Sequence, residues 1–276
     1  MQPPILPRAL EVCEAAARAG GRVLLDWVGR FGVSNKGPRD LVTEADLASQ
    51  REIRRIVMEA FPDYGFIGEE SLPEHAGDAR PGEGQGNGVP AIRWMVDPLD
   101  GTSNYVHGFP AWCVSIALAI GDEILVGTVH DPVRDECFTA QLGGGAFLNG
   151  RPIRATSTTD LADALVALSF PPHVTPGSEP VADFLAVLPH VHSVRRTGST
   201  AINLAWLACG RLDAFWVRRI ACWDVAAGLL LLREAGGSIS GFADDADPAA
   251  LIPLDQPAFI AACTPEVLAA LRARLP

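Results

Sequence analysis

Apolar residues recur every three or four positions near the start of the chain, which predicts an amphipathic helix from about Leu6 to Val28. The pair Gly20-Gly21 is expected to weaken the helix locally. A second helix is expected from Asp40 to about Phe61. Near its start, Thr43 is followed three residues later by Asp46, the pattern of a capping box in which aspartate replaces the usual glutamate.

Short apolar runs separated by turn residues predict strands through the middle of the chain. The run from Ile92 to Val96 should end at Asp97, because the proline that follows cannot donate to a sheet ladder. The dipeptide Asn149-Gly150 is typical of a hairpin turn. The expected strands are Asp63–Ser71, Ala111–Ile120, Glu123–His130 and Glu136–Gln141, the last three forming an antiparallel meander.

Helices and strands alternate in the second half of the chain. The expected strands are 164–170, 193–196, 212–217 and 258–263, and the expected helices are 178–188, 199–209, 224–235 and 265–275. Together with the meander, this order predicts a layered α/β or α+β sandwich. We expect one domain over residues 1–276, built from two packed halves of roughly 1–150 and 151–276. Residues Leu72–Pro90 are rich in Gly, Pro and acids and predict a loop without regular structure.

Composition narrows the class of protein. Nearly half of the residues are hydrophobic, as in a globular protein, and no apolar run is long enough to span a membrane. The net charge of −11 and the lack of a basic stripe argue against a nucleic acid polymer as partner. The six cysteines are scattered without a Cys-x-x-Cys pair, so we expect free thiols in the cytoplasm.

The segment from Trp94 to Pro110 carries the strongest chemical signal. Asp97 and Asp100 flank the carbonyl of Leu99 on a predicted loop, so three oxygens can converge on one hard cation. Gly101 and Thr102 then supply backbone N–H groups and a hydroxyl suited to phosphate. A turn stabilised by its own aspartates is the alternative, and the matching acids elsewhere favour a functional site.

Other candidate residues are open to two interpretations. Asp46 is either a helix cap or part of a site, and the segment Arg195–Thr200 is either a helix N-cap or a contact for an anion or for substrate hydroxyls. Lys36, the only lysine, is either a solvated charge or a neutralising partner for an anion. Asp224 begins an apolar helix, where a carboxylate is costly unless it is paired or bound to a metal.

Four motifs, in order, resemble the inositol monophosphatase family of magnesium-dependent, lithium-sensitive phosphatases. The motifs are Leu41-Val-Thr-x-x-Asp46, Gly68-Glu-Glu-Ser71, Trp94-x-x-Asp97-Pro-Leu-Asp-Gly-Thr-x-Asn104 and Trp223-Asp-Val-Ala-Ala-Gly228. The resemblance implies a five-layered αβαβα sandwich of the inositol monophosphatase/fructose-1,6-bisphosphatase type, usually a homodimer. It covers the chain from the first helix to the last strand.

The resemblance also implies roles for individual residues. Two or three Mg²⁺ ions would be held by Glu69, Asp97, the Leu99 carbonyl, Asp100 and Asp224. Thr102 and Asp46 would form the catalytic pair that takes a proton from metal-bound water. Glu69 would help to hold a third ion, and Lys36 would lie near the site as a charge. The substrate would contact Asp100, Gly101, Thr102, Gly198, Ser199, Thr200 and Asp224.

One position departs from the family pattern. Members that prefer inositol carry a glutamate seven residues before the aspartate of the fourth motif, and this chain has Val217 there, followed by Arg218 and Arg219. The missing hydroxyl acceptor weakens the case for inositol itself, while the arginines favour a second anionic group.

We therefore expect a phosphomonoesterase for a small phosphorylated polyol or amino alcohol, with inositol monophosphate leading. Histidinol phosphate, fructose 1,6-bisphosphate and a 3′-phosphonucleotide are alternatives on the same fold. A non-catalytic phosphosugar-binding module is a further alternative, which the full set of acids disfavours.

Overall fold

The computed structural model describes residues 5–37, 40–70, 92–171, 173–242 and 251–276. The predicted loop Leu72–Pro90 lies outside the described residues. So does the side chain of Lys36, although its backbone belongs to a described strand.

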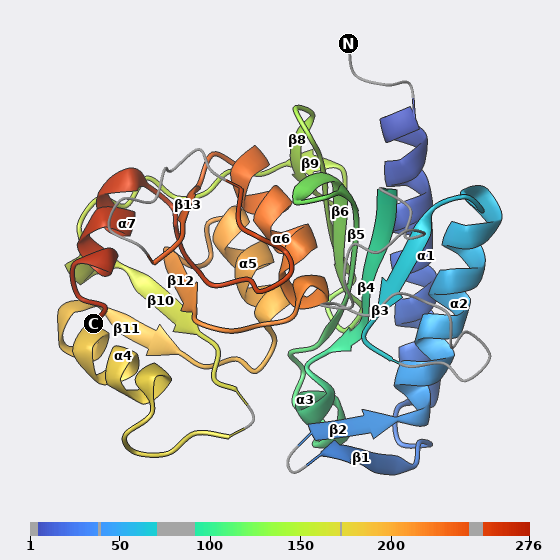
Figure 1. Cartoon of the computed structure of the whole chain (residues 1–276), viewed down its shortest axis with the longest axis horizontal. Helices are drawn as coiled ribbons and strands as arrows, with labels where there is room; N and C mark the ends of the chain where they lie inside the picture. The colour runs from blue at the N-terminus through green and yellow to red at the C-terminus, as the bar shows by residue number, and fades with distance from the viewer. Residues whose placement is uncertain (1–4, 38–39, 71–91, 172, 243–250) are drawn as a thin grey trace.

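A large sheet forms the framework of the first half of the chain (Figure 1). β3 and β4 are parallel, and every later pair in this sheet is antiparallel. In spatial order the strands are β3 (Gly65–Gly68), β4 (Ile92–Asp100), β5 (Cys113–Ile120), β6 (Glu123–Asp131), β7 (Glu136–Gln141), β8 (Gly145–Leu148) and β9 (Arg151–Pro152). The meander and the hairpin at Asn149 are thereby confirmed.

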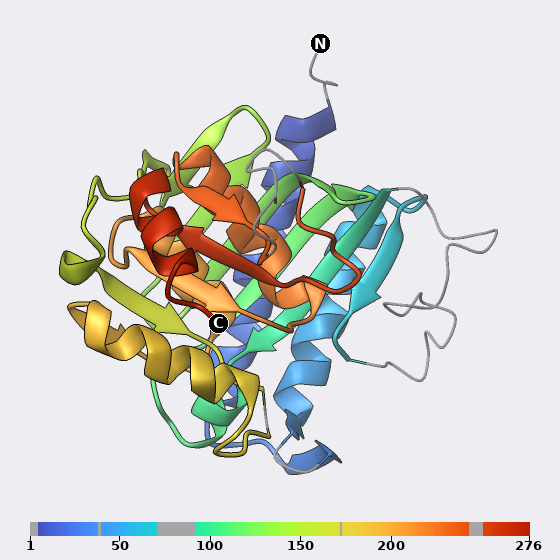
Figure 2. The same ribbon diagram turned by 60° about the vertical axis from the view of Figure 1, so that its left-hand side comes forward.

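A smaller mixed sheet belongs to the second half of the chain. Its parallel part is β11–β10–β12, and β14 and β13 continue it with antiparallel pairs. In spatial order the strands are β11 (Ser193–Arg195), β10 (Leu165–Leu168), β12 (Ala214–Val217), β14 (Phe259–Ala262) and β13 (Ser238–Ser240). Figure 2 shows this sheet in front of a helix layer, with the large sheet behind that layer.

Helices complete the layers. α1 (Ile5–Trp27) and α2 (Glu44–Ala60) cover the outer face of the large sheet, and α5 (Thr200–Ala208) and α6 (Cys222–Glu234) lie between the sheets. α4 (Glu179–Val187) and α7 (Pro265–Arg272) cover the outer face of the small sheet (Figure 1). The expected five-layered αβαβα order is confirmed. Short elements fill the connections: the hairpin β1 (Val33–Gly37)–β2 (Asp40–Thr43), α3 (Thr102–Val106), η2 (Leu161–Asp163) and η3 (Leu188–His190).

Two hydrophobic clusters hold these layers together. The larger one fills the space on both sides of the small sheet and around α5 and α6, and includes Trp216, Phe215 and Phe259. The second lies between the large sheet and the pair α1 and α2, and includes Trp94 and Leu24. A sheet covers α6 on each side, so the helix is buried all round. This explains why every residue from Val225 to Leu232 is buried and why the helix is so apolar.

Three details of the expected elements are wrong. β4 does not end at Asp97 but continues to Asp100, because the β4–β5 ladder is irregular between these residues and Pro98 needs no N–H partner there. Residues 40–43 form β2 rather than the first turn of α2, which begins at Glu44 after the confirmed cap at Thr43. The glycine pair of α1 is not a soft spot, since a Cβ on Gly20 would lie only 2.7 Å from Ile53 of α2.

Candidate active site

The predicted site residues come from four elements whose ends meet between the two halves. Asp46 lies in the first turn of α2, Asp97 and Asp100 lie at the end of β4, and Asp224 lies in the first turn of α6. Glu69 directly follows β3. Because β3 and β4 are parallel neighbours, Glu69 lies at the same end of the sheet as the carboxyl end of β4. The backbone N–H of Glu69 donates to the Val96 carbonyl at 3.0 Å.

Asp46 caps helix α2 and also contacts a second predicted site residue. Its Oδ2 accepts hydrogen bonds from the backbone N–H and the hydroxyl of Thr43, which completes the capping box. Its Oδ1 accepts a hydrogen bond from the Thr102 hydroxyl at 3.3 Å. The same hydroxyl lies 3.2 Å from the Leu99 carbonyl, and Asp46 is fully buried. The sequence-predicted pair Asp46 and Thr102 is therefore in contact.

The turn that carries Thr102 requires glycine. Gly101 has φ +98° and immediately precedes α3, and a Cβ there would lie 2.9 Å from the Ala111 carbonyl. L-residues with a side chain rarely adopt this backbone conformation. The glycine therefore lets β4 turn sharply into α3. As a result, backbone N–H groups lie at the end of β4, the strand that carries Asp97 and Asp100.

Asp100 joins the two halves of the chain. Its Oδ2 accepts hydrogen bonds from the Ser199 hydroxyl and from the backbone N–H of Ala201, both at 2.6 Å. Ser199 also caps α5 by accepting from Ile202 N–H at 3.3 Å. The Thr200 hydroxyl is 2.8 Å from Ser169 Oγ. The hydroxyls of Ser199 and Thr200 thus have partners within the chain, and their predicted contact with substrate stays a prediction.

Gly198 completes this junction. It has φ +90°, and a Cβ there would lie 2.8 Å from the amide nitrogen of Asn104. Asn104 in turn donates to the carbonyl of Thr197 at 2.8 Å. The segment 197–200 is consequently held against α3 of the first half.

The carboxylates of this site are crowded and poorly solvated. Burial raises the pKa of Asp97 well above its ordinary value, and the negative charges of Glu69, Asp224 and Asp100 raise it further. Burial raises the pKa of Asp224 in the same way, with added repulsion from Asp100 and Glu69. Burial raises the pKa of Asp100 to about 6, against the opposing hydrogen bonds from Ser199 and Ala201. A bound cation would relieve this repulsion.

The donor set is all oxygen, which fits Mg²⁺ or another hard divalent cation. The negative charges of these side chains act on one another: those of Glu69, Asp224 and Asp100 act on Asp97, and those of Asp100 and Glu69 act on Asp224. Among the described residues, no three His, Cys, Asp or Glu side chains already have the spacing of a metal site. These carboxylates therefore fit the ion by their oxygen chemistry and by their proximity to one another.

Sequence reasoning missed three polar residues beside the site. Ser49 donates from its hydroxyl to the Pro98 carbonyl at 3.1 Å, and Gln50 bonds to the backbone of Glu70. Cys113 lies 4.0 Å from an oxygen of Asp100, and burial raises its pKa well above the ordinary value, so its thiol stays protonated. The signal for the first two was present as polar residues three and four positions after Asp46, on the face of α2 that should be apolar.

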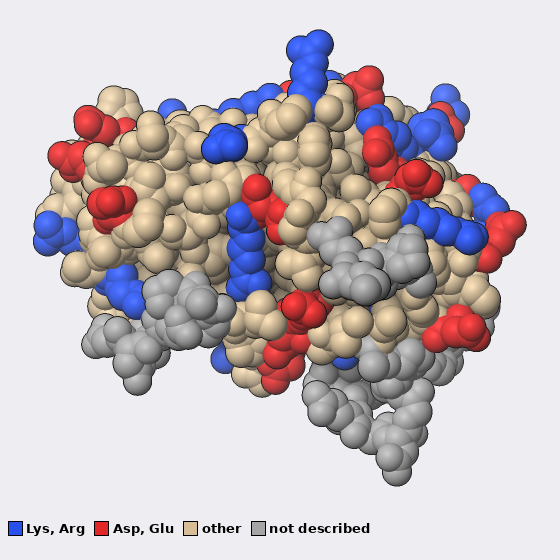
Figure 3. Space-filling view, turned by 90° about the horizontal axis from the view of Figure 1, so that it is seen from above, with Lys and Arg blue, Asp and Glu red and all other residues tan. Residues whose placement is uncertain are grey.

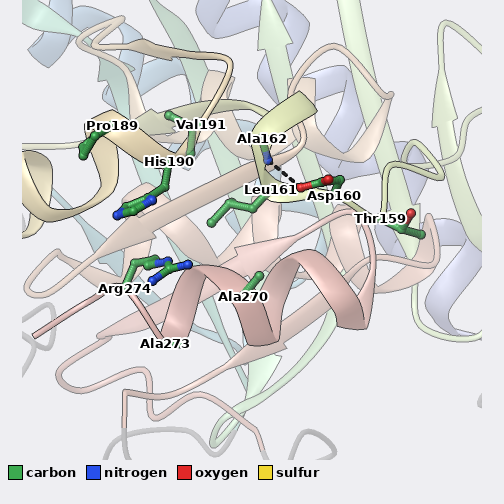
Figure 4. A pocket seen from close by; sticks show the side chains of 10 residues that line it. All are labelled: Thr159, Asp160, Leu161, Ala162, Pro189, His190, Val191, Ala270, Ala273 and Arg274. Atoms are coloured by element: carbon green, nitrogen blue, oxygen red, sulfur yellow. Dashed lines mark hydrogen bonds between the residues drawn. The ribbon is translucent and has the colours of Figure 1, made fainter.

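A separate surface cavity of about 640 Å³ lies between η2, η3 and α7 (Figure 4). Asp160 lies at its rim, where the carboxylate accepts a hydrogen bond from Ala162 N–H, and His190 and Arg274 face it from the opposite side. None of the predicted site residues lines it. This cavity is therefore distinct from the carboxylate cluster.

Comparison with known proteins agrees with this arrangement. The sequence profile of the inositol monophosphatase family matches residues 8–274. The chain belongs to the inositol monophosphatase family. An inositol-1-monophosphatase from Rhizobium meliloti is 42% identical over 228 residues, which cover 81% of each chain. A protein named Nus factor SuhB from Xylella fastidiosa is 40% identical over 238 residues, 85% of this chain and 82% of the relative.

A solved structure of the same fold supports the family membership. The extragenic suppressor protein suhB from Bartonella henselae superposes with a TM-score of 0.83 at 34% identity, covering 96% of this chain and 97% of that one. Members of the family are metal-dependent phosphatases, and this chain is a phosphoric monoester hydrolase of that fold. All six cysteines are free thiols, so no cross-link contributes to its stability.

Proposed function

We propose that this protein is a Mg²⁺-dependent phosphatase of a small polyol phosphate, with inositol monophosphate as the leading substrate. The observation that carries this proposal is the gathering of Asp97, Asp100 and Asp224 beside Glu69: burial raises the pKa values of the three aspartates, and the charge of Glu69 raises each of them further. Such crowding of buried carboxylates is costly and is typical of a site that binds a cation.

The roles of the chain's residues follow from their positions. Glu69, Asp97, the Leu99 carbonyl, Asp100 and Asp224 would hold two or three Mg²⁺ ions. When bound, these ions would stabilise the charge that develops during phosphoryl transfer and make a water molecule more acidic. The N–H groups of Gly101 and Thr102 would bind the phosphate. Lys36 is retained as a proposed neutralising charge.

Proton transfer is assigned to Thr102 and Asp46. The Thr102 hydroxyl already donates to Asp46 Oδ1, so a proton gained by the threonine oxygen can pass to the carboxylate. Asp46 is fixed for this task because its other oxygen is occupied by the capping box. No serine or cysteine nucleophile is needed, and the buried thiol of Cys113 has the wrong protonation state for one.

The substrate assignment rests on the residues at the end of β12. Val217 is 3% exposed and has no acceptor for a sugar hydroxyl. Arg218, which the sequence suggested for a second anionic group, instead makes a bidentate ion pair with buried Asp183 at 2.6 and 2.8 Å. With this charge neutralised, we favour a monophosphate over a bisphosphate, in keeping with the names of the relatives.

A panel of phosphate monoesters assayed with Mg²⁺, with and without Li⁺, tests the proposal. We expect hydrolysis of inositol monophosphate that requires Mg²⁺ and is inhibited by Li⁺. Asp97→Asn should abolish turnover and leave the far-UV circular dichroism spectrum unchanged. Near-normal activity of Asp97→Asn would refute the proposed role of the cluster.

Three further properties complete the proposal. The two halves fold as one domain, which is supported by the α5–α6 layer packed between both sheets. We place the protein in the cytoplasm, supported by its free thiols; none of the described helices is long and apolar enough to cross a bilayer. We also propose that it binds no nucleic acid polymer, which is supported by the interspersed acidic and basic residues on the face in Figure 3, and we keep the homodimer as a proposal that rests on the family resemblance alone.

A further inference from the structure

Helix α2 buries an unusual polar stripe toward the candidate active site. Asp46, Ser49 and Gln50 lie at positions i, i+3 and i+4, so they share one face of the helix. Each is at most 1% exposed. Buried polar groups are retained in proteins when they are hydrogen-bonded, so each of these side chains needs a partner inside the molecule.

Each residue of the stripe reaches a different segment of the site. Asp46 contacts Thr102 of α3, and Ser49 donates to the Pro98 carbonyl within β4. Gln50 reaches the chain that follows β3. Little more than one turn of α2 therefore contacts all the segments of the first half that carry proposed metal ligands.

The contact made by Gln50 is bidentate and entirely to main chain. Its amide nitrogen donates to the Glu70 carbonyl at 2.6 Å, and its amide oxygen accepts from the Glu70 backbone N–H at 2.9 Å. Gly68 lies directly against the amide, since a Cβ there would collide with it. The Gln50 amide thus occupies the place of a neighbouring strand for one residue beyond the end of β3.

Glu69 lies between two hydrogen bonds that hold its backbone and that of the next residue. Its own N–H bonds to Val96 of β4, and the next residue is held by Gln50. Within the described residues, the β3–β4 pairing runs as far as Gly68 and Val96, so Glu69 lies directly beyond the end of this ladder. These two hydrogen bonds hold the backbone on either side of the Glu69 side chain.

We propose that Gln50 is a positioning residue that orients Glu69 for metal binding. The proposal rests on the proposed function, because it takes Glu69 as a ligand. An amide is suited to this place since it supplies both a donor and an acceptor, whereas a carboxylate has no donor for the Glu70 carbonyl. Groups that orient a ligand in this way commonly change metal affinity by about 10- to 100-fold when they are removed.

The test is the binding of Mn²⁺ to the full-length protein, followed from the electron paramagnetic resonance signal of the free ion. Gln50→Met keeps the approximate volume and removes both hydrogen bonds, so we expect about 10- to 100-fold weaker binding. Gly68→Ala pushes a methyl group against the amide and should weaken binding in the same direction by less. It serves as the second variant in case Gln50→Met does not fold.

Ile53→Ala is the matched control. Ile53 is fully buried one turn further along the same face of α2, and it packs toward α1 rather than the site. Its loss destabilises the helix packing, yet Mn²⁺ affinity should stay at the wild-type value at a temperature where the variant is folded. This readout separates positioning from a general loss of stability.

The outcomes distinguish the two proposals. If the wild-type protein does not bind Mn²⁺, or if Asp97→Asn binds it as well as wild type does, the proposed function fails. If those two behave as expected but folded Gln50→Met and Gly68→Ala bind Mn²⁺ with wild-type affinity, only the role of Gln50 is overturned. Weaker binding in both variants, with Ile53→Ala unchanged, supports it.

Discussion

Replacing Asp100 by Asn should stabilise the protein when no metal is present, and the gain should depend on pH. Asp100 is 9% exposed, and its pKa is raised from an ordinary 3.8 to about 6 in the folded protein. Between these two values the folded state binds more protons than the unfolded state does. The stability of the wild-type protein therefore falls as pH rises through this window, and the loss is complete above pH 6.

The size of the effect follows from the shift in pKa. One pKa unit corresponds to about 1.4 kcal/mol, so ionising Asp100 in the folded protein costs roughly 3 kcal/mol above pH 6 and about half of that near pH 5. Asn removes this cost and can still accept from Ser199 and Ala201 through its amide oxygen. It also relieves Asp97 and Asp224, whose pKa values are raised in part by the charge of Asp100.

Urea unfolding in EDTA at several pH values measures this difference. Asp100→Asn should exceed the wild-type free energy of unfolding by roughly 3 kcal/mol at pH 8, and the two should converge below about pH 4. Saturating Mg²⁺ should reverse the order, because a ligand that binds only the folded state stabilises it. Asp160→Asn, which removes an exposed acid at η2, controls for the general effect of charge. If Asp100→Asn is no more stable than wild type at pH 8 in EDTA, burial and the neighbouring charge do not raise the pKa of Asp100 as described.

Three other substitutions probe separate parts of the structure. Thr102→Val should lower kcat by about 10²- to 10⁴-fold because it removes the hydroxyl that donates to Asp46, and Thr102→Ser should restore most of it; equal rates for the two in a steady-state assay would contradict the assigned proton path. Arg218→Met should reduce the free energy of unfolding by about 3–5 kcal/mol because Asp183 would be left buried and unpaired, and an unchanged urea midpoint would show that the pair is dispensable. Gly127→Val should cost about 1–3 kcal/mol or more, since a Cβ on β6 would lie 2.9 Å from Ala227 of α6; a wild-type thermal midpoint would mean that this close packing is absent.

The sequence predicted the elements well where the hydrophobic pattern agreed with the turn and capping residues at its ends. The meander, the hairpin at Asn149 and the capping box at Thr43 each have a strong local signal, and each is present. The hairpin β1–β2 and the edge strand β13 were missed because short strands carry too little periodicity to stand out. The end of β4 was misplaced because Pro98 is tolerated at an irregularity that only the pairing with β5 reveals.

The candidate site was predictable as a set of acids but not as an arrangement. The motifs named Asp97, Asp100 and Asp224, yet no local pattern tells that Asp100 is held by Ser199 and Ala201, about a hundred residues away. The neutralisation of Arg218 by Asp183 is likewise a tertiary contact that sequence alone does not encode visibly. Long-range pairing of polar groups is the part of the site that reading along the chain could not supply.

The hydrogen bonds from Ser199 and Ala201 to Asp100 make the candidate active site a joint product of both halves of the polypeptide. Residues 1–150 supply most of the acids, but the oxygen of Asp100 is held in place only after the later segment has docked. In a nascent or nicked chain whose later segment has not docked, the acidic side chains would not be held in the positions described above. Hydrolysis should therefore require the complete fold of both halves. The architecture disfavours activity before synthesis of the chain has ended.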